Sequence, residues 1–471
     1  MRRLSSIILI AGTLRADAAA GQETRSGPAA AESAIAVVGG TLVNPRAAPV
    51  RDAVIVVRGR RVVCAGPRSA CPIPAGARLI EARGGYVIPG LIDAHVHYSQ
   101  TGWVDGRPDA VDLREEFPYE EVVGTLRREP ERFHRAWLCS GVTSVFDVGG
   151  YTWTFDLARA TREAVDAPRV VAAGPLLSTI DHWVNLPTMR QFIAMRDDSL
   201  VRATVRAQAA TGAEAIKVWY LNLPDSARAR MRPLLELAGA EAARARLPLI
   251  VHATELRTAK EALAAGAKVL VHSVERDTVD AEFLDLARRN GTTVVPTLTV
   301  REGYADVYMA RSPSARYPLV CVDSATRGKL ERAIPEQRRQ RGMRVVGAGV
   351  WDRQRATMEE NLRRLHAAGI PIAMGTDAGN PGTAHGPSVY REMEAMQHAV
   401  LPAAEVLASA TIVAARAMGI ADDAGSLEAG KRADLVVLDG DPTADIANAR
   451  RVRLVMRNGA PYRQSELVAR P

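Results

Sequence analysis

Lysine is scarce in this chain. Only five of its 61 lysine and arginine residues are lysines, namely Lys217, Lys260, Lys268, Lys329 and Lys431. Because arginine supplies the positive charge almost everywhere else, a lysine inside an apolar run needs a reason other than charge. Lys217, in the run Ala215-Ile216-Lys217-Val218-Trp219, is such a lysine.

The chain also has no long apolar run and no block of basic residues. No segment is long enough to span a membrane, which argues against stable membrane insertion. The net charge of +8 comes mainly from scattered arginines without interleaved aromatic residues, a pattern that favours a solvated surface over nucleic-acid binding. With 471 residues, 47% of them hydrophobic, the composition predicts one large and one smaller globular domain and leaves a homo-oligomer open.

Cysteine is rare too, with four residues in all. Cys64 and Cys71 flank a Gly-Pro turn and could form a local disulfide in an oxidising compartment. They could equally be two small buried hydrophobic residues. Cys139 and Cys321 carry no spacing typical of a metal site.

Residues 1–22 have the three parts of a secretory signal peptide. Met1-Arg2-Arg3 is basic, residues 4–14 form a short apolar core, and Ala18-Ala19-Ala20 offers small residues for cleavage. Arg15 and Asp17, beside the cleavage site, are atypical of such signals. The segment predicts export to the periplasm or out of the cell, with a cytoplasmic location as the alternative.

Short strands separated by turns occur at both ends of the chain. They are expected at 35–38, 53–57 and 61–64 in residues 33–88, and at 433–438 and 452–456 in residues 421–466. Neither set can bury a core alone. We therefore expect the two ends to pair into one small β-sandwich domain from which the middle of the chain is inserted.

Residues 89–420 alternate between strands and helices. Amphipathic stretches such as 202–210, 234–245 and 357–368 separate eight candidate strands at 91–97, 142–148, 169–173, 215–219, 248–253, 268–272, 292–297 and 371–376. This alternation predicts an α/β fold with a (β/α)8 TIM barrel. The long interruption from 302 to about 351 would lie over the barrel mouth as a lid.

The first candidate strand ends in two histidines, His95 and His97. Side chains alternate along a strand, so both imidazoles point to one face while Val96 points to the other. The active sites of barrels lie at the carboxyl ends of the strands, where such a pair can bind a metal ion. Taken alone, the pattern fits a pair of hydrogen-bonded core histidines equally well.

Three other candidate strands end in similar residues. The fifth ends at His252, the sixth at His272, and the eighth is followed by Asp377. Each has an ordinary explanation, a core histidine or, for Asp377, a helix cap or Asx turn. Their recurrence at strand ends of one barrel instead predicts a converging metal site, with Asp377 as both ligand and proton acceptor.

Lys217 lies in the fourth candidate strand. Its stem could pack while its amine reaches solvent, as in most lysines, but a barrel strand leaves little room for this. A buried amine without a partner loses its proton. A neutral amine can take up carbon dioxide as a carbamate, whose two oxygens can bridge two metal ions, and arginine cannot do so.

Taken together, these residues resemble the amidohydrolase superfamily over nearly the whole mature chain. Residues 87–97 (VIPGLIDAHVH) resemble its first-strand signature, residues 369–379 (GIPIAMGTDAG) its eighth, and residues 425–437 (GSLEAGKRADLVV) its return to the small β domain. The most similar branch comprises imidazolonepropionase-like and prolidase-like members, including secreted dipeptidases with a carboxylated lysine.

The resemblance implies a ligand set for two divalent metal ions. His95, His97 and Asp377 would hold the more buried ion, His252 and His272 the more exposed one, and Lys217, carboxylated by CO2, would bridge them. Imidazole and carboxylate ligands favour Zn2+, with manganese and cobalt as alternatives.

The resemblance also implies a reaction on a small-molecule substrate. A metal-bridging hydroxide would hydrolyse an amide bond, with Asp377 taking the proton and delivering it to the leaving amine. A dipeptide or an N-acyl amino acid is the expected substrate, and the same site would suit lactones and phosphotriesters. The alternatives are a mononuclear deaminase or imidazolonepropionase-type cyclic amide hydrolase, and a metal-free binding protein on the same barrel.

Substrate-binding residues are harder to read from the sequence. Tyr220 and His182 are the first candidates, as donors to a substrate carbonyl or carboxylate. His385, Trp183 and Arg301 also follow candidate strands or lie on nearby loops. Loop packing or surface hydrogen bonding explains each of them at least as well.

Overall fold

The computed structural model describes residues 34–182, 184–309, 311–330 and 348–468. The predicted signal peptide, Trp183 and residues 331–347 of the predicted lid lie outside these ranges. None of the described helices has the length and apolar character needed to cross a membrane.

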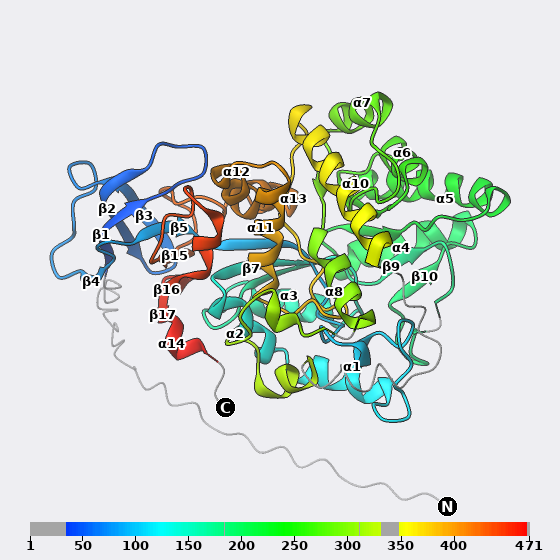
Figure 1. Ribbon diagram of the computed structural model, residues 1–471, viewed down its shortest axis with the longest axis horizontal. Helices are drawn as coiled ribbons and strands as arrows, with labels where there is room; N and C mark the ends of the chain where they lie inside the picture. The colour runs from blue at the N-terminus through cyan, green and yellow to red at the C-terminus, as the bar shows by residue number, and fades with distance from the viewer. Residues whose placement is uncertain (1–33, 183, 310, 331–347, 469–471) are drawn as a thin grey trace, which may run out of the picture. The chain divides into compact units, whose positions relative to one another are not determined.

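Strands from both ends of the chain form one mixed sheet of eight strands (Figure 1). Its order is β17-β16-β15-β5-β1-β2-β3, and β4 pairs with β1. The N-terminal and C-terminal parts meet where β5 pairs antiparallel with β15. The strands are β1 (Ile35–Leu42), β2 (Val50–Arg58), β3 (Arg61–Pro67), β4 (Arg78–Glu81), β5 (Tyr86–Pro89), β15 (Leu435–Leu438), β16 (Val452–Arg457) and β17 (Ala460–Arg463).

This sheet confirms a β-rich part built from both chain ends. Its strands form one continuous hydrogen-bonded sheet. Alternating residues of β1 and β2 bury apolar side chains on both faces: Val37 and Ile55 pack in one cluster, Val38 and Val54 in another. Both faces of these strands are therefore buried, and Leu435 and Met456 from the C-terminal part share the first cluster.

The middle of the chain forms two parallel sheets in a TIM-barrel-type arrangement. The first has the order β6-β7-β8 and the second β10-β9-β11-β12-β13-β14. A hydrogen bond from the Glu214 amide to the Ala172 carbonyl connects β8 to the start of β11. The strands are β6 (Leu91–Val96), β7 (Val142–Asp147), β8 (Arg169–Ala172), β9 (Leu176–Ser178), β10 (Phe192–Ala194), β11 (Ile216–Trp219), β12 (Leu249–His252), β13 (Val269–Val271) and β14 (Thr293–Val295).

The eighth predicted strand, 371–376, is not a regular strand. Its backbone bonds to β14 through Val294, but the Met374 amide donates to the Ser409 carbonyl instead of to a strand. Further on, the Asp377 amide donates to the His95 carbonyl in β6. The segment thus lies between β14 and β6 and bonds to both, without the consecutive pairs that make a strand, so the described residues show seven of the eight predicted strands.

Helices lie outside these strands (Figure 1). They are α1 (Tyr119–Arg128), α2 (Glu131–Cys139), α3 (Thr154–Thr161), α4 (Asp198–Thr211), α5 (Asp225–Arg244), α6 (Leu256–Ala264), α7 (Ala281–Asn290), α8 (Leu298–Tyr308), α10 (Ala348–Ala367), α11 (Ser388–Ala399), α12 (Ala403–Ala408), α13 (Ala414–Ala417) and α14 (Gln464–Leu467). The described residues also form the short 3-10 helices η1 (Val104–Gly106), η2 (Pro313–Ala315) and η4 (Ile446–Arg450) and the π-helix η3 (Ser409–Val413).

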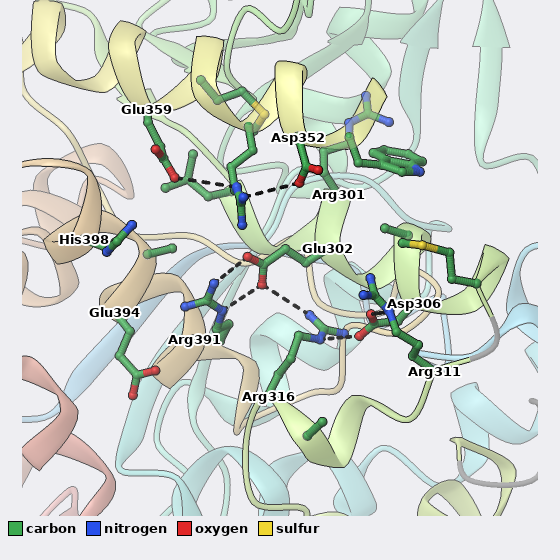
Figure 2. Close-up of a pocket in the computed structure, with 18 of the residues that line it drawn as sticks. Arg301, Glu302, Asp306, Arg311, Arg316, Asp352, Glu359, Arg391, Glu394 and His398 are labelled. Carbon is green, nitrogen blue, oxygen red and sulfur yellow. Dashed lines mark hydrogen bonds and ion pairs between the residues drawn. The ribbon is translucent and has the colours of Figure 1, made fainter. Parts of the chain in front are cut away.

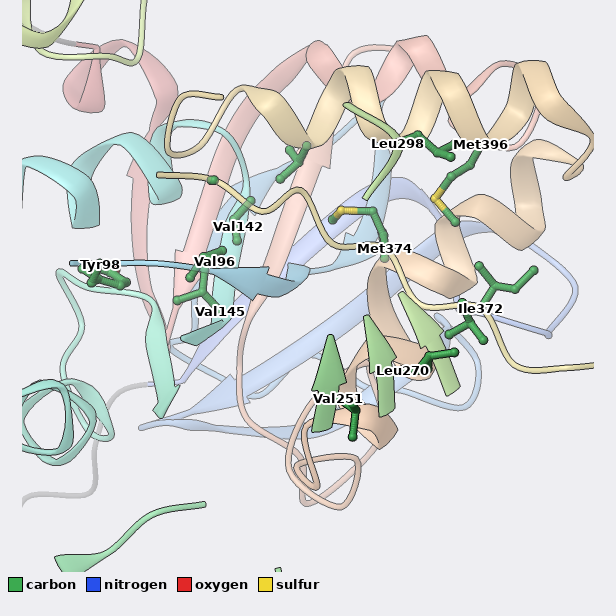
Figure 3. Close-up of a cluster of buried hydrophobic side chains, with 14 of the residues drawn as sticks. Val96, Tyr98, Val142, Val145, Val251, Leu270, Leu298, Ile372, Met374 and Met396 are labelled. Atoms are coloured by element: carbon green, nitrogen blue, oxygen red, sulfur yellow. The ribbon is translucent and has the colours of Figure 1, made fainter. Parts of the chain in front are cut away.

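Two apolar layers hold the strands in place. Residues such as Val96, Val145, Val251 and Leu270 belong to the large cluster that the strands share with the helices (Figure 3). Alternate residues, among them Ile92, Phe146, Val171, Ile250 and Val269, form a second cluster that packs against η3 and α13. The strands are therefore packed against apolar side chains on both faces.

Part of the predicted lid packs on the loop that follows β6. Val307, Tyr317, Leu319 and Val322 form a buried cluster with Trp103 and Val104. A disulfide joins Cys321 of this segment to Cys139 at the end of α2. The lid segment is therefore fixed to the barrel-type core both by packing and by a covalent bond.

Candidate metal centre

His95 and His97 are brought to one face of β6 at its carboxyl end. Side chains alternate along the strand, so both imidazoles point away from the apolar cluster that contains Val96. The register between β6 and β7 also shifts between Asp93 and Val96. The two Nε2 atoms lie 3.3 Å apart. His97 Nδ1 donates to the Gly149 carbonyl at 2.7 Å, so the Nε2 of a neutral His97 ring carries the lone pair.

Asp377 faces both histidines. Its Oδ1 lies 3.2 Å from His95 Nε2 and 3.0 Å from His97 Nε2. The backbone at Asp377 is left-handed, with φ of 60°, a conformation that is strained for a residue other than glycine and is typical of functional sites. This conformation turns the carboxylate toward β6.

Two glycines permit this approach. A Cβ at Gly375 would lie 2.5 Å from the Val295 side chain and 2.9 Å from the Cβ of His95. At Gly379, where φ is 106°, a Cβ would lie 2.5 Å from the His97 carbonyl oxygen. Only glycine lets the segment around Asp377 come this close to β6.

His272 and His252 lie beside the first three residues. His272 has a left-handed backbone with φ of 74°, and its Nδ1 lies 2.8 Å from Thr297 Oγ1 and 3.9 Å from Asp377 Oδ2. One ligand atom each from His95, His272 and Asp377 lies within 4.8 Å of the others. The rings of His252 and His272 are 4.4 Å apart, so the predicted histidines do gather in one place.

Lys217 lies in β11 on the same face as Ala215, which belongs to the cluster inside the strands. Its side chain is buried, with 3% of its surface exposed. Burial lowers the pKa of its amine to about 7, although the charge of Asp377 opposes the shift. An appreciable fraction of this amine is therefore neutral near pH 7, which carbamate formation requires.

The pKa values of the cluster favour the protonation states that metal binding needs. Burial lowers the pKa of His95 to about 4 and also puts those of His252 and His272 well below the usual value. Burial alone would raise the pKa of Asp377, but the neighbouring His95 and His97 bring it well below its usual value. Burial thus favours the neutral rings of His95, His252 and His272, and the two neighbouring histidines favour an ionised Asp377.

The donor set fits a divalent cation. His95 Nε2, His97 Nε2 and Asp377 Oδ1 are all within 3.3 Å of one another. A carboxylate oxygen and two ring nitrogens at these distances can all contact one cation placed between them. Nitrogen and oxygen ligands of this kind are those that zinc and related ions prefer.

Two buried carboxylates that the sequence did not single out support the site. Asp93 accepts hydrogen bonds from the His95 amide and from Thr376, and burial raises its pKa to about 7. Asp147, at the end of β7, accepts from the Tyr98 and Gly149 amides, and burial raises its pKa as well. A polar residue inside an apolar strand run was the signal that could have identified both.

The predicted substrate residues lie in different surroundings. Tyr220 is buried, and its hydroxyl donates to Glu261 Oε2 of α6 at 2.6 Å. His182 stacks on Phe192 with ring centres 4.7 Å apart, and Trp219 lies 5.3 Å from His182 and 6.0 Å from His252. His182 is therefore linked to the histidine cluster through Trp219, whereas the Tyr220 hydroxyl bonds to a surrounding helix.

His385 and Arg301 also have protein partners. The His385 ring lies 3.9 Å from that of Phe133 and close to Tyr98 and Trp137, with Nε2 2.9 Å from the Gln100 carbonyl oxygen. Arg301 pairs with Glu275. These contacts match the packing and hydrogen-bonding explanations, and a role in substrate binding stays a prediction for both residues.

A cavity of about 980 Å³ lies between α8, α10 and α11 (Figure 2). Glu302 lies between Arg391 and Arg316 in it, and Asp306 pairs with Arg316 and Arg311. None of the six predicted metal ligands lines this cavity. Arg301 lines the cavity, and most of its opposite charges pair with each other.

The barrel-type core, the β-rich part and the histidine–aspartate cluster together define a class of protein. The sequence matches the amidohydrolase family over residues 86–461, and the chain belongs to this family. As a member of this family, the chain is a hydrolase of carbon–nitrogen bonds.

Individual relatives fall in the expected branch. The chain is 27% identical over 423 residues to an imidazolonepropionase of Caulobacter vibrioides, a match that covers 84% of this chain and 90% of the relative. The solved structure of a Xaa-Pro dipeptidase with bound methionine superposes with a TM-score of 0.69 at 22% identity, covering 92% of this chain and all of the other. A prolidase complexed with N-methylphosphonate-L-proline gives 0.67 at 23% identity, with coverage of 92% and 100%. These two structures show a shared fold.

Proposed function

We propose that this amidohydrolase binds two divalent metal ions and hydrolyses the amide bond of a dipeptide or an N-acyl amino acid. The observation that carries the proposal is the buried Lys217 amine, with a pKa near 7, in the same site as four histidines and Asp377. The dipeptidase and the prolidase of the same fold support the substrate class.

Each residue has a role in this proposal. His95, His97 and Asp377 would hold the more buried ion, His252 and His272 the more exposed one, and carboxylated Lys217 would bridge the two. The ions would supply Lewis-acid activation of the substrate carbonyl and of a water molecule. The Asp377 carboxylate would accept the proton of that water and return it to the nitrogen of the leaving amine.

A second candidate rests on a different observation. Two relatives that align over most of the chain, from Caulobacter vibrioides and Aromatoleum aromaticum, are imidazolonepropionases. Hydrolysis of a cyclic amide with one metal ion would not require Lys217 as a ligand. The two candidates therefore differ in metal content and in the effect of removing the Lys217 amine.

The test is metal per chain on purified protein, expressed with zinc and bicarbonate. We expect two ions in the wild type and one in Lys217→Ala. Lys268→Ala is the matched control, because its amine bonds to the Asn290 carbonyl at the surface and should leave the metal content unchanged. One ion in both wild type and Lys217→Ala would favour the cyclic amide hydrolase, and none would favour the metal-free binding protein. A screen of dipeptides, N-acyl amino acids, cyclic amides, lactones and phosphotriesters then addresses the substrate.

We also propose that the chain is exported. The sequence of residues 1–22 supports this, as do the two disulfides, Cys64–Cys71 and Cys139–Cys321, since such bonds persist in oxidising compartments. Fractionation of producing cells, with N-terminal sequencing of the mature protein, tests it. Cytoplasmic protein that retains residues 1–22 would contradict export.

A further inference from the structure

Asn380 lies three residues after Asp377 and is almost completely buried, with 3% of its surface exposed. Its Nδ2 donates to Asp377 Oδ1 at 2.7 Å and to the Asp377 carbonyl at 3.2 Å. The oxygen that receives the first bond is the one that faces His95 and His97. Asn380 thus contacts the carboxylate oxygen at the centre of the histidine cluster.

The other side of the amide is held by two donors. Asn380 Oδ1 accepts from the Arg107 guanidinium and from the Tyr304 hydroxyl, the latter at 2.9 Å. A guanidinium can only donate and an ionised carboxylate can only accept. A reversed amide would place N–H groups against Arg107 and its oxygen against Asp377, so the orientation of the amide is fixed by its neighbours.

The two donors come from separate parts of the chain. Arg107 follows η1 in the loop after β6, and its guanidinium forms a bidentate pair with Asp109 at 2.7 and 2.8 Å. Tyr304 lies in α8, after β14. The loop after β6 and α8 are therefore both connected to Asp377 through one side chain.

We propose that Asn380 is a positioning residue that holds Asp377 Oδ1 against the Nε2 atoms of His95 and His97. Arg107 and Tyr304 keep its amide in the orientation that donates to Asp377. The inference rests on the proposed function, because Asn380 acts through the metal-holding carboxylate of Asp377. Groups that orient a metal ligand in this way affect metal affinity or activity about 10- to 100-fold.

Two substitutions separate this role from simple packing. Asn380→Asp keeps an oxygen for Arg107 and Tyr304 but cannot donate to Asp377, whereas Asn380→Ala removes both contacts. Asn448→Asp is the matched control, because its amide bonds to the Asp441 carbonyl in the region of η4, away from the cluster. The measurements are the zinc dissociation constant by chelator competition, kcat and KM on a substrate from the screen, and the melting temperature.

We expect both Asn380 variants to bind zinc about 10- to 100-fold more weakly and to lose kcat, with KM nearly unchanged. Tyr304→Phe should lose less zinc affinity and less kcat than either Asn380 variant, because Arg107 still bonds to the amide oxygen. This variant also tests the inference if Asn380→Asp fails to fold. Asn448→Asp loses a comparable hydrogen bond and should match the wild type in zinc affinity, kcat and KM.

Wild-type zinc affinity and kcat in Asn380→Asp, with losses only in Asn380→Ala, would overturn the inference, since the amide would then serve only Arg107 and Tyr304. If Tyr304→Phe loses as much zinc affinity and kcat as Asn380→Ala, then Arg107 alone does not keep the amide oriented, which would contradict the inference that both residues hold it. Wild-type protein that binds no zinc would overturn the proposed function together with the inference, so the two failures are distinguishable.

Discussion

The carboxylate of Asp93 accepts a 2.6 Å hydrogen bond from the hydroxyl of Thr376. The Thr376 amide donates to the same carboxylate at 3.0 Å, and so does the His95 amide at 3.1 Å. Asp93 precedes the His95–His97 pair, and Thr376 precedes Asp377. One buried carboxylate therefore connects the two segments that carry three of the predicted metal ligands.

Thr376→Val should destabilise the protein. It removes the hydroxyl that donates to Asp93 and accepts from the Ala378 amide, and leaves buried partners unsatisfied. We expect a loss of about 1–3 kcal/mol in the free energy of unfolding, measured by urea denaturation. Thr376→Ser keeps the hydroxyl and is the control. Equal stability of the two variants would show that this hydroxyl contributes little.

Asp377→Asn should retain metal but lose turnover. The amide can still contact the cluster through its oxygen, but it cannot accept the proton that we assign to Asp377. We expect kcat to fall about 10²- to 10⁴-fold, with metal per chain measured by elemental analysis. Turnover like that of the wild type would remove Asp377 from the mechanism.

Tyr220→Phe distinguishes a structural from a substrate-binding hydroxyl. The Tyr220 hydroxyl bonds to Glu261, which also pairs with Arg228. We therefore expect a stability loss of about 1 kcal/mol and a kcat/KM within about threefold of the wild type. A fall of 100-fold in kcat/KM at unchanged stability would instead make Tyr220 a substrate residue.

Glu392 should make stability depend on pH. It is fully buried in α11 and accepts hydrogen bonds from the Leu298 and Thr299 amides at the start of α8, yet burial raises its pKa to about 7 from 4.5. Between these values the unfolded chain loses a proton that the folded chain keeps, so this contribution to stability falls as pH rises from about 4.5 to 7.

Between pH 4.5 and 7, the loss in the free energy of unfolding is on the order of 3 kcal/mol. Glu392→Gln has no such titration and serves as the reference. As pH rises, the unfolding free energy of the wild type should fall relative to that of Glu392→Gln. A difference that is constant from pH 4.5 to 8 would contradict the raised pKa.

No free thiol is expected, because both cysteine pairs are disulfide-bonded. A thiol assay on denatured, unreduced protein should find none, and four after reduction. Replacing Cys139 and Cys321 by serine should cost about 2–5 kcal/mol, because that disulfide closes a loop with a sequence separation of 182. The Cys64 and Cys71 pair, separated by 7, should cost less. Four thiols before reduction would contradict both bonds.

The sequence by itself determined the family, the alternation of strands and helices, and the clustering of histidines. His95 and His97 are separated by one residue at the end of an apolar run, so strand geometry alone puts them on one face. His252 ends another such run, and His272 directly follows a third. The strands at both chain ends could be predicted as well, because the residue pattern of a strand is local.

Only the tertiary structure decided the geometry of the site. The left-handed backbones of His272 and Asp377, the shift in register at Val96 and the contact of Asn380 with Asp377 depend on how separate segments pack. The bond between Cys139 and Cys321 and the loss of regular pairing at 371–376 have the same origin. Local patterns predict which way a side chain points along a regular strand. Backbone strain and long-range contacts arise only when segments distant in the sequence pack against one another.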